Sequence, residues 1–185
     1  SATGILYLKK DSPFVQGHFP GQPVMPGVLI VEAFGQTAAA LTAHGIDKKT
    51  IEKLLPHREP MLLIDKLTKI VHLKSATAIM YVKKNGFYVQ GHFPDQPVMP
   101  GVLIVEAFGQ AAAALTACGI DSKEYDNRLV YLMGIDKARF RNPVIPDCKL
   151  ELKIESIRSH GRVWKYKGEA FVDDKKMADA QWSAT

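Results

Sequence analysis

Residues 101–118 constrain the fold more than any other part of the chain. They form a run that is apolar on nearly every side of a helix, so a helix here must be buried. Pro100 stands just before the run, where a helix tolerates proline best, and Gly119 follows it as a C-terminal cap. Glu106 and Gln110 interrupt the apolar surface one turn apart, on one face. The sequence therefore predicts one long central helix with the rest of the domain built around it.

Strand patterns lie on both sides of this predicted helix. Runs rich in Ile, Val, Thr and Tyr are separated by turn residues such as Asn142-Pro143 and Asp173-Asp174. We predict an α+β fold in which a curved antiparallel sheet wraps around the long central helix. The expected elements are a short helix over 51–60, strands over 61–71 and 75–84, a Pro- and Gly-rich loop over 86–100, and strands over 129–140, 149–157, 163–172 and 177–184.

An internal repeat divides the chain in two. Residues 1–50 align without gaps onto residues 75–124, with 38 of 50 positions identical. Solenoids need three or more copies, so two copies indicate a partial duplication. We expect residues 51–185 to form the complete domain and residues 1–50 to copy its strand, loop and central helix. The copy can displace its twin, complete a neighbouring subunit by a swap, or result from the artificial joining of a fragment.

Composition narrows the classes of function. The formal charge of +5 and the pI near 9.1 are too weak to indicate nucleic-acid binding. They favour an acidic protein partner, with a basic surface that only keeps the protein in solution as the alternative. The two cysteines lie 30 residues apart and fit neither a metal motif nor a disulfide scaffold. The uninterrupted apolar stretch 102–105 is far too short to cross a membrane. We therefore expect no metal, no cofactor and no membrane, and a cytoplasmic location.

Three groups near the start of the central helix suit acid–base chemistry. His92, in the proline-rich loop, can titrate near neutral pH and serve as a general base. Glu106, on a buried helix, is costly unless it is paired or kept protonated. The N–H of Gly101 opens the helix, where it can meet a carbonyl oxygen that gains negative charge. Taken singly, the histidine can be structural and the glutamate can simply bond a loop, but together they supply a base, an acid and an electrophile.

The chain resembles a known family in the motifs that carry these groups. The motifs are Leu55-Pro56-His57-Arg58-Glu59-Pro60-Met61-Leu62-Leu63-Ile64-Asp65, Gly91-His92-Phe93-Pro94, the segment from Pro97 through Pro100-Gly101 to Glu106, and Asp136-Lys137 through Phe140-Arg141 and Pro143. Over residues 51–185 they are similar to the 3-hydroxyacyl-acyl-carrier-protein dehydratases of dissociated fatty acid synthesis, which have a hot-dog fold. The sister branch, which also isomerises the double bond, carries Asp where Glu106 stands, so this chain resembles the dehydratase-only branch.

The resemblance implies roles for the three groups. His92 takes the C2 proton, Glu106 is the acid or water-orienting group at the C3 hydroxyl, and the Gly101 N–H holds the thioester carbonyl. The substrate is implied to be a (3R)-hydroxyacyl group linked through 4'-phosphopantetheine to acyl carrier protein. The family's site lies at a homodimer interface, with His and Glu from different subunits, and the dimers form hexamers as trimers of dimers.

Further residues follow from the same resemblance and from the repeat. Tyr131 is expected to gate the acyl tunnel or to be an ordinary core tyrosine. Phe93 and Val102 are also expected to line the tunnel. Carrier docking is assigned to the alternating Lys137, Arg139 and Arg141, for which a solvated strand face is the alternative. The duplicated site residues are His18, Gly27 and Glu32.

Three other histidines are expected to be inert. We predict that His57 packs the first helix against the sheet and that His72 and His160 are solvated at turns. Two rival functions remain open at this point: an acyl thioester hydrolase, and a non-catalytic scaffold that binds the carrier protein.

Overall fold

The computed structural model describes residues 5, 30, 33, 45–120, 130–160 and 162–185. The chain divides into two compact units, Ser1–His44 and Gly45–Thr185. The duplicated residues His18, Gly27 and Glu32 lie outside the described residues. The second unit begins at Gly45, so it includes residues 45–50, which the repeat had assigned to the duplicate.

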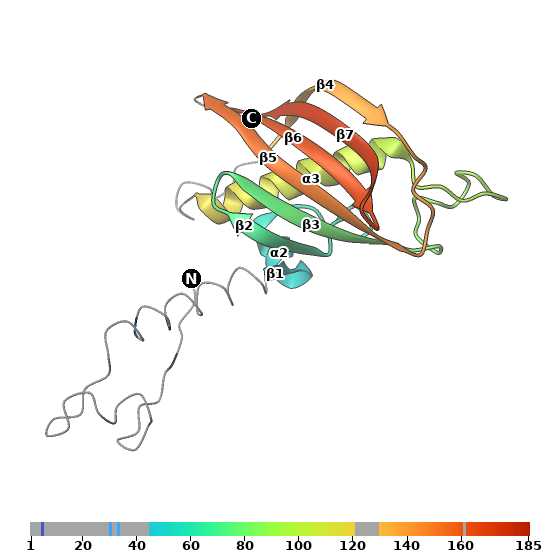
Figure 1. Cartoon of the computed structure of the whole chain (residues 1–185), viewed down its shortest axis with the longest axis horizontal. Helices are drawn as coiled ribbons and strands as arrows, with labels where there is room; N and C mark the ends of the chain where they lie inside the picture. The colour runs from blue at the N-terminus through green and yellow to red at the C-terminus, as the bar shows by residue number, and fades with distance from the viewer. Residues whose placement is uncertain (1–4, 6–29, 31–32, 34–44, 121–129, 161) are drawn as a thin grey trace, which may run out of the picture. The chain divides into compact units, whose positions relative to one another are not determined.

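The second unit is an antiparallel sheet that curves across one side of a long helix, α3 (Figure 1). Its seven strands run in the order β1-β2-β3-β5-β6-β7-β4, and every pairing is antiparallel. The prediction of an α+β hot-dog fold is confirmed. The elements are β1 (Ile46–Asp47), α2 (Lys48–Leu54), β2 (Lys66–Val71), β3 (Ser75–Val82), α3 (Gly101–Gly119), β4 (Leu132–Phe140), β5 (Cys148–His160), β6 (Val163–Val172) and β7 (Lys175–Ala184).

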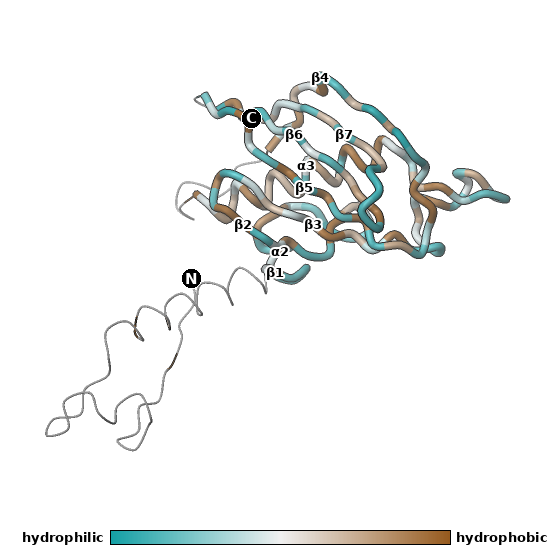
Figure 2. Tube along the Cα trace, viewed as in Figure 1, coloured by the Kyte–Doolittle hydropathy of each residue, from teal (hydrophilic) through white to brown (hydrophobic). Residues whose placement is uncertain are grey.

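The core lies between α3 and the inner face of the sheet. Inward positions of the strands alternate with polar outward ones, a pattern visible along the strands in Figure 2. Phe108 of α3 fills the space above Gly168 of β6, where an added Cβ would lie 2.7 Å from its ring, and its ring stacks on Trp182. By length and composition alone α3 could span a membrane, but 67% of its apolar stretch is buried inside this unit. It is the core helix of the domain.

Residues 45–50 build the first elements of the domain. Ile46 and Asp47 pair with β2 as a short strand that the sequence did not reveal. The Asp47 carboxylate caps α2 by accepting from the Thr50 N–H at 2.9 Å and its hydroxyl at 2.7 Å, which lowers the pKa of Asp47. Gly45 has φ +61°, and an added Cβ would lie 2.1 Å from the Leu67 carbonyl oxygen, so only glycine fits there. Helix α2 therefore covers Lys48–Leu54, earlier than the predicted range of 51–60.

Two other local predictions are wrong. The strand expected over 61–71 begins only at Lys66, because Gln110 of α3 bonds the backbone of Met61 and Leu63 and holds this segment out of the sheet. Gly119 is the last residue of α3 and not a left-handed cap. An added Cβ at Gly119 would lie 2.5 Å from the Leu73 side chain, so a larger residue there would require Leu73 to move.

Strand β4 ends the sheet and presents apolar side chains to solvent. It pairs with β7 on one side, and the exposed fractions of Met133, Ile135 and Phe140 are 56%, 48% and 53%. An exposed, apolar sheet edge of this length is a template for pairing with another chain. Among the described strands, none pairs with the outer side of β4.

Candidate functional site

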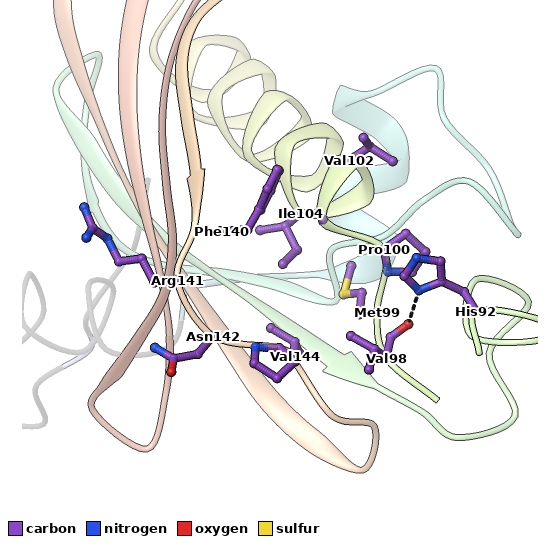
Figure 3. Close-up of a pocket in the computed structure, with 12 residues that line it drawn as sticks. His92, Val98, Met99, Pro100, Val102, Ile104, Phe140, Arg141, Asn142 and Val144 are labelled. Atoms are coloured by element: carbon purple, nitrogen blue, oxygen red, sulfur yellow. Dashed lines mark hydrogen bonds between the residues drawn. The ribbon is translucent and has the colours of Figure 1, made fainter. Parts of the chain in front are cut away.

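The loop between β3 and α3 holds His92 by its backbone and its ring. The His92 N–H donates to the Val89 carbonyl at 3.1 Å, and the His92 carbonyl accepts from the Val98 N–H at 2.8 Å. The ring Nδ1 lies 2.9 Å from the Val98 carbonyl oxygen (Figure 3). A carbonyl only accepts, so Nδ1 carries the hydrogen and Nε2 keeps its lone pair. This tautomer is the one that a general base requires.

His92 lines a cavity of about 380 Å³ at the start of α3. The first N–H groups of a helix have no partner within the helix, so Gly101 presents a donor at the rim of this cavity. Gly101 also allows the close approach of Phe140, because an added Cβ would lie 2.7 Å from its ring. The base and the electrophile predicted from the sequence therefore line one cavity. The other lining residues are Val98, Met99, Pro100, Val102, Ile104, Arg141, Asn142, Pro143 and Val144.

Glu106 lies in a different place. It lines a second, smaller cavity of about 80 Å³, between α3 and the C-terminal strand. The remaining lining residues are Leu55, Pro56, His57, Gly109, Gln110, Ala113, Val130, Leu132, Trp182 and Ala184. Within the described parts of the chain, no residue lines both cavities. One chain thus presents the predicted base and the predicted acid in two separate cavities.

The Glu106 carboxylate is held by Gln110, one turn further along α3. The Gln110 side chain is 1% exposed, and its Oε1 accepts from the Leu63 N–H at 2.9 Å. Its Nε2 donates to the Met61 carbonyl at 2.7 Å and to Glu106 Oε1 at 3.0 Å. The Leu63 N–H and the Met61 carbonyl determine which end of the Gln110 amide is oxygen and which is nitrogen. The atom that contacts Glu106 is therefore the nitrogen, which donates. The prediction that Glu106 and Gln110 share one face is confirmed.

Sequence reasoning missed His57 as a neighbour of the predicted acid, Glu106. Its Nε2 lies 3.5 Å from Glu106 Oε1, and both side chains are about one third exposed. The sequence predicts only a packing role for this histidine. The position of His57 in the proline-bounded motif of residues 55–65 could have indicated a role in the site, because Gln110 binds the backbone of the same motif.

The predicted tunnel residues are all exposed in the single chain. Phe93 stacks on the His92 ring with centroids 4.4 Å apart and is 59% exposed, and Val102 lines the His92 cavity and is 72% exposed. Tyr131 is 61% exposed and lies outside both cavities, just before β4, where its backbone pairs with Thr185.

The predicted docking cations follow β4. Lys137 and Arg139 are exposed on this strand. The Arg141 Nε donates to Asp179 at 2.6 Å, a pairing that raises the pKa of Arg141. Arg141 is also among the residues that line the His92 cavity, although its side chain points away from the others (Figure 3). His72 and His160 are exposed, as predicted.

Among the residues that the structure describes, no group of three or more His, Cys, Asp or Glu side chains is placed to hold a metal ion. Cys118 and Cys148 are free thiols, and burial raises the pKa of both.

Comparisons with known proteins agree with the geometry. The model of the FabA-like domain matches residues 1–54 and again residues 55–181. The chain is 48% identical over 139 residues to the 3-hydroxyacyl-[acyl-carrier-protein] dehydratase FabZ of Anaeromyxobacter sp. (strain K), covering 75% of this chain and 89% of the relative. It is 46% identical over 152 residues to the FabZ of Gluconobacter oxydans, covering 80% and 89%.

Solved structures support the fold alone. The dehydratase heterocomplex ApeI:P from Xenorhabdus doucetiae is similar with a TM-score of 0.63 at 15% identity, covering 72% of this chain and 88% of the other. An uncharacterized protein from Pyrococcus horikoshii is similar with a TM-score of 0.52 at 14% identity, covering 68% and 85%.

Proposed function

The chain belongs to the FabA-like family, and we propose that it removes water from (3R)-hydroxyacyl groups on acyl carrier protein, giving trans-2-enoyl groups in fatty acid biosynthesis. The observation that carries this proposal is the His92 tautomer. Its Nδ1–H is committed to the Val98 carbonyl, so Nε2 is free to take a proton in the cavity where α3 begins. The enzyme is a hydro-lyase.

The residues divide the reaction between them. His92 Nε2 takes the proton from C2 as the Gly101 N–H stabilises the negative charge that grows on the thioester oxygen. The electron pair forms the C2–C3 double bond, and the C3–O bond breaks. Glu106 gives its proton to the departing hydroxyl, which leaves as water. The proton gained by His92 and the proton lost by Glu106 balance, and the proton then returns to the carboxylate.

Two copies of the chain complete each site in this proposal. His92 and Glu106 line separate cavities within one chain, and the β4 edge leaves apolar side chains uncovered. Pairing of two chains through this edge would bury those side chains and add a second chain beside each cavity. We propose a homodimer with His92 and Gly101 from one subunit and Glu106 from the other, and a trimer of such dimers as the full assembly.

The partner is proposed to be acyl carrier protein with its substrate on 4'-phosphopantetheine, in the cytoplasm. Lys137 and Arg139 lie on β4 and Arg141 follows its last residue, where the chain reaches the His92 cavity; three cations in this place suit an acidic partner. Phe93, Val102 and Tyr131 are proposed to line the acyl tunnel once the second subunit covers them.

The experiment is a spectrophotometric assay on 3-hydroxybutyryl and crotonyl thioesters, with free thiol measured in parallel. We expect interconversion of the two thioesters without thiol release. Thiol release would identify a hydrolase, and no turnover would leave a binding scaffold. His92→Ala combined with His18→Ala should lower turnover by about 10²–10⁴-fold, the usual contribution of a general base. If the double variant kept more than a few per cent of the activity, His92 would not be the base.

A further inference from the structure

Two side-chain nitrogens lie near one oxygen of Glu106. Gln110 Nε2 lies 3.0 Å from Oε1, and His57 Nε2 lies 3.5 Å from the same atom. The Gln110 amide is oriented by two backbone groups, so its donor character is settled independently of Glu106. Oε1 is therefore the accepting oxygen of the carboxyl group, and a proton on this group belongs on Oε2.

The backbone places His57 in this position. Arg58 Nη1 donates to the Leu55 carbonyl at 2.8 Å and to the His57 carbonyl at 2.7 Å. The Leu62 N–H donates to the Arg58 carbonyl at 2.9 Å and closes the turn. Three hydrogen bonds thus hold the backbone on both sides of His57, the residue whose ring lies beside Glu106.

The environment of the ring selects its tautomer. Nδ1 of His57 is buried and, among the described residues, meets no hydrogen-bond partner. Nε2 faces a carboxylate oxygen, so the single N–H of a neutral ring is favoured on Nε2, where it can donate. A neutral donor also holds Glu106 without placing a full positive charge beside an acid that must keep its proton. The other described residues that line this cavity carry no titratable side chain.

We propose that His57 is a positioning residue for Glu106: its Nε2–H donates to Oε1 and leaves Oε2 to deliver the proton to the C3 hydroxyl. This inference rests on the dehydratase function proposed above. The separation of 3.5 Å is long for a hydrogen bond, and such contacts in catalytic sites tighten when substrate binds. His57 itself does not touch the reacting atoms.

The test compares two substitutions of His57 in the full chain, with kcat and KM measured separately. His57→Leu removes the donor and should lower kcat about tenfold with KM changed less than about twofold, because the hydrogen bond matters at proton transfer. His57→Gln keeps an N–H near the position of Nε2 and should recover most of the lost kcat. His72→Leu is the matched control, since His72 is exposed in a turn, and its kinetics should equal those of the parent.

The outcomes separate this inference from the function on which it rests. A parent chain that does not dehydrate the substrate refutes the proposed function. An active parent with His57→Leu turnover equal to it, or with His57→Gln as slow as His57→Leu, overturns the role of His57. If His57→Leu fails to fold, ¹⁵N NMR of the histidine rings in the parent decides. We expect the Nε2–H tautomer at His57, and an Nδ1–H tautomer would refute the proposal.

Discussion

Replacing Gln110 by alanine tests the buried amide that ties α3 to the segment before β2. The variant leaves the Leu63 N–H buried without its acceptor, at a cost of about 1–3 kcal/mol. It also removes the hydrogen bond to the Met61 carbonyl, worth about 1 kcal/mol net. The free energy of unfolding should therefore fall by about 2–4 kcal/mol, and Tm by about 4–16 °C for a chain of this size.

Urea unfolding followed by tryptophan fluorescence measures this loss, with all proteins at one concentration because assembly contributes to stability. Gln181→Ala is the matched control: Gln181 is exposed on β7, and its loss should change the free energy by less than about 0.5 kcal/mol. If Gln110→Ala lost under about 1 kcal/mol, or no more than the control, the amide would not hold this segment and the reasoning would be refuted.

Three further experiments test the candidate site and the bounds of the domain. Glu106→Gln should reduce turnover by at least about a hundredfold with Tm nearly unchanged, since the amide keeps the shape but cannot act as an acid; turnover equal to the parent would make Glu106 structural. Gly101→Ala should lower the free energy of unfolding by about 1–3 kcal/mol, because the added Cβ meets the Phe140 ring at 2.7 Å. Adding Phe140→Ala should restore most of the lost stability, as measured by urea unfolding. A chain starting at Gly45 should be active, and light scattering should show an oligomer. A chain starting at Ile51 lacks β1 and the cap of α2, so its Tm should be lower. An active, stable monomer of the chain starting at Gly45 would contradict the shared site.

The central helix and most strands could be predicted from the sequence. The apolar run after Pro100 has only one stable environment, and the structure places the helix at Gly101–Gly119. The strand Val163–Val172 has the predicted bounds because turn residues stand at both ends. In these parts the local pattern and the tertiary structure favour the same answer.

The errors lie where a distant residue decides the local structure. Residues 61–64 are apolar like a strand, yet the amide of Gln110, 47 positions from Leu63, takes their backbone groups. His57 looked like a packing residue because its neighbour Glu106 is equally remote in sequence. The short strand Ile46–Asp47 was hidden because the repeat assigned it to the wrong part of the chain.

The sequence predicts which residues form the candidate site, but it does not predict how one chain arranges them. The structure joins His92 and Gly101 in one cavity, because both flank the same short loop. It places Glu106 in another, although all three are close in sequence. The motif predicts which residues carry the chemistry, whereas the side of α3 on which each group lies follows from packing.

The separation of His92 and Glu106 into two cavities has a consequence for genetics. If each site draws on two subunits, an allele without the base and an allele without the acid are not equivalent defects. A mixed dimer of the two would pair the intact base of one chain with the intact acid of the other, and its second site would lack both. Random association of equal amounts, in chains without the duplicate, would rebuild about a quarter of the parental sites. Two alleles that are each null would then complement one another within a single gene.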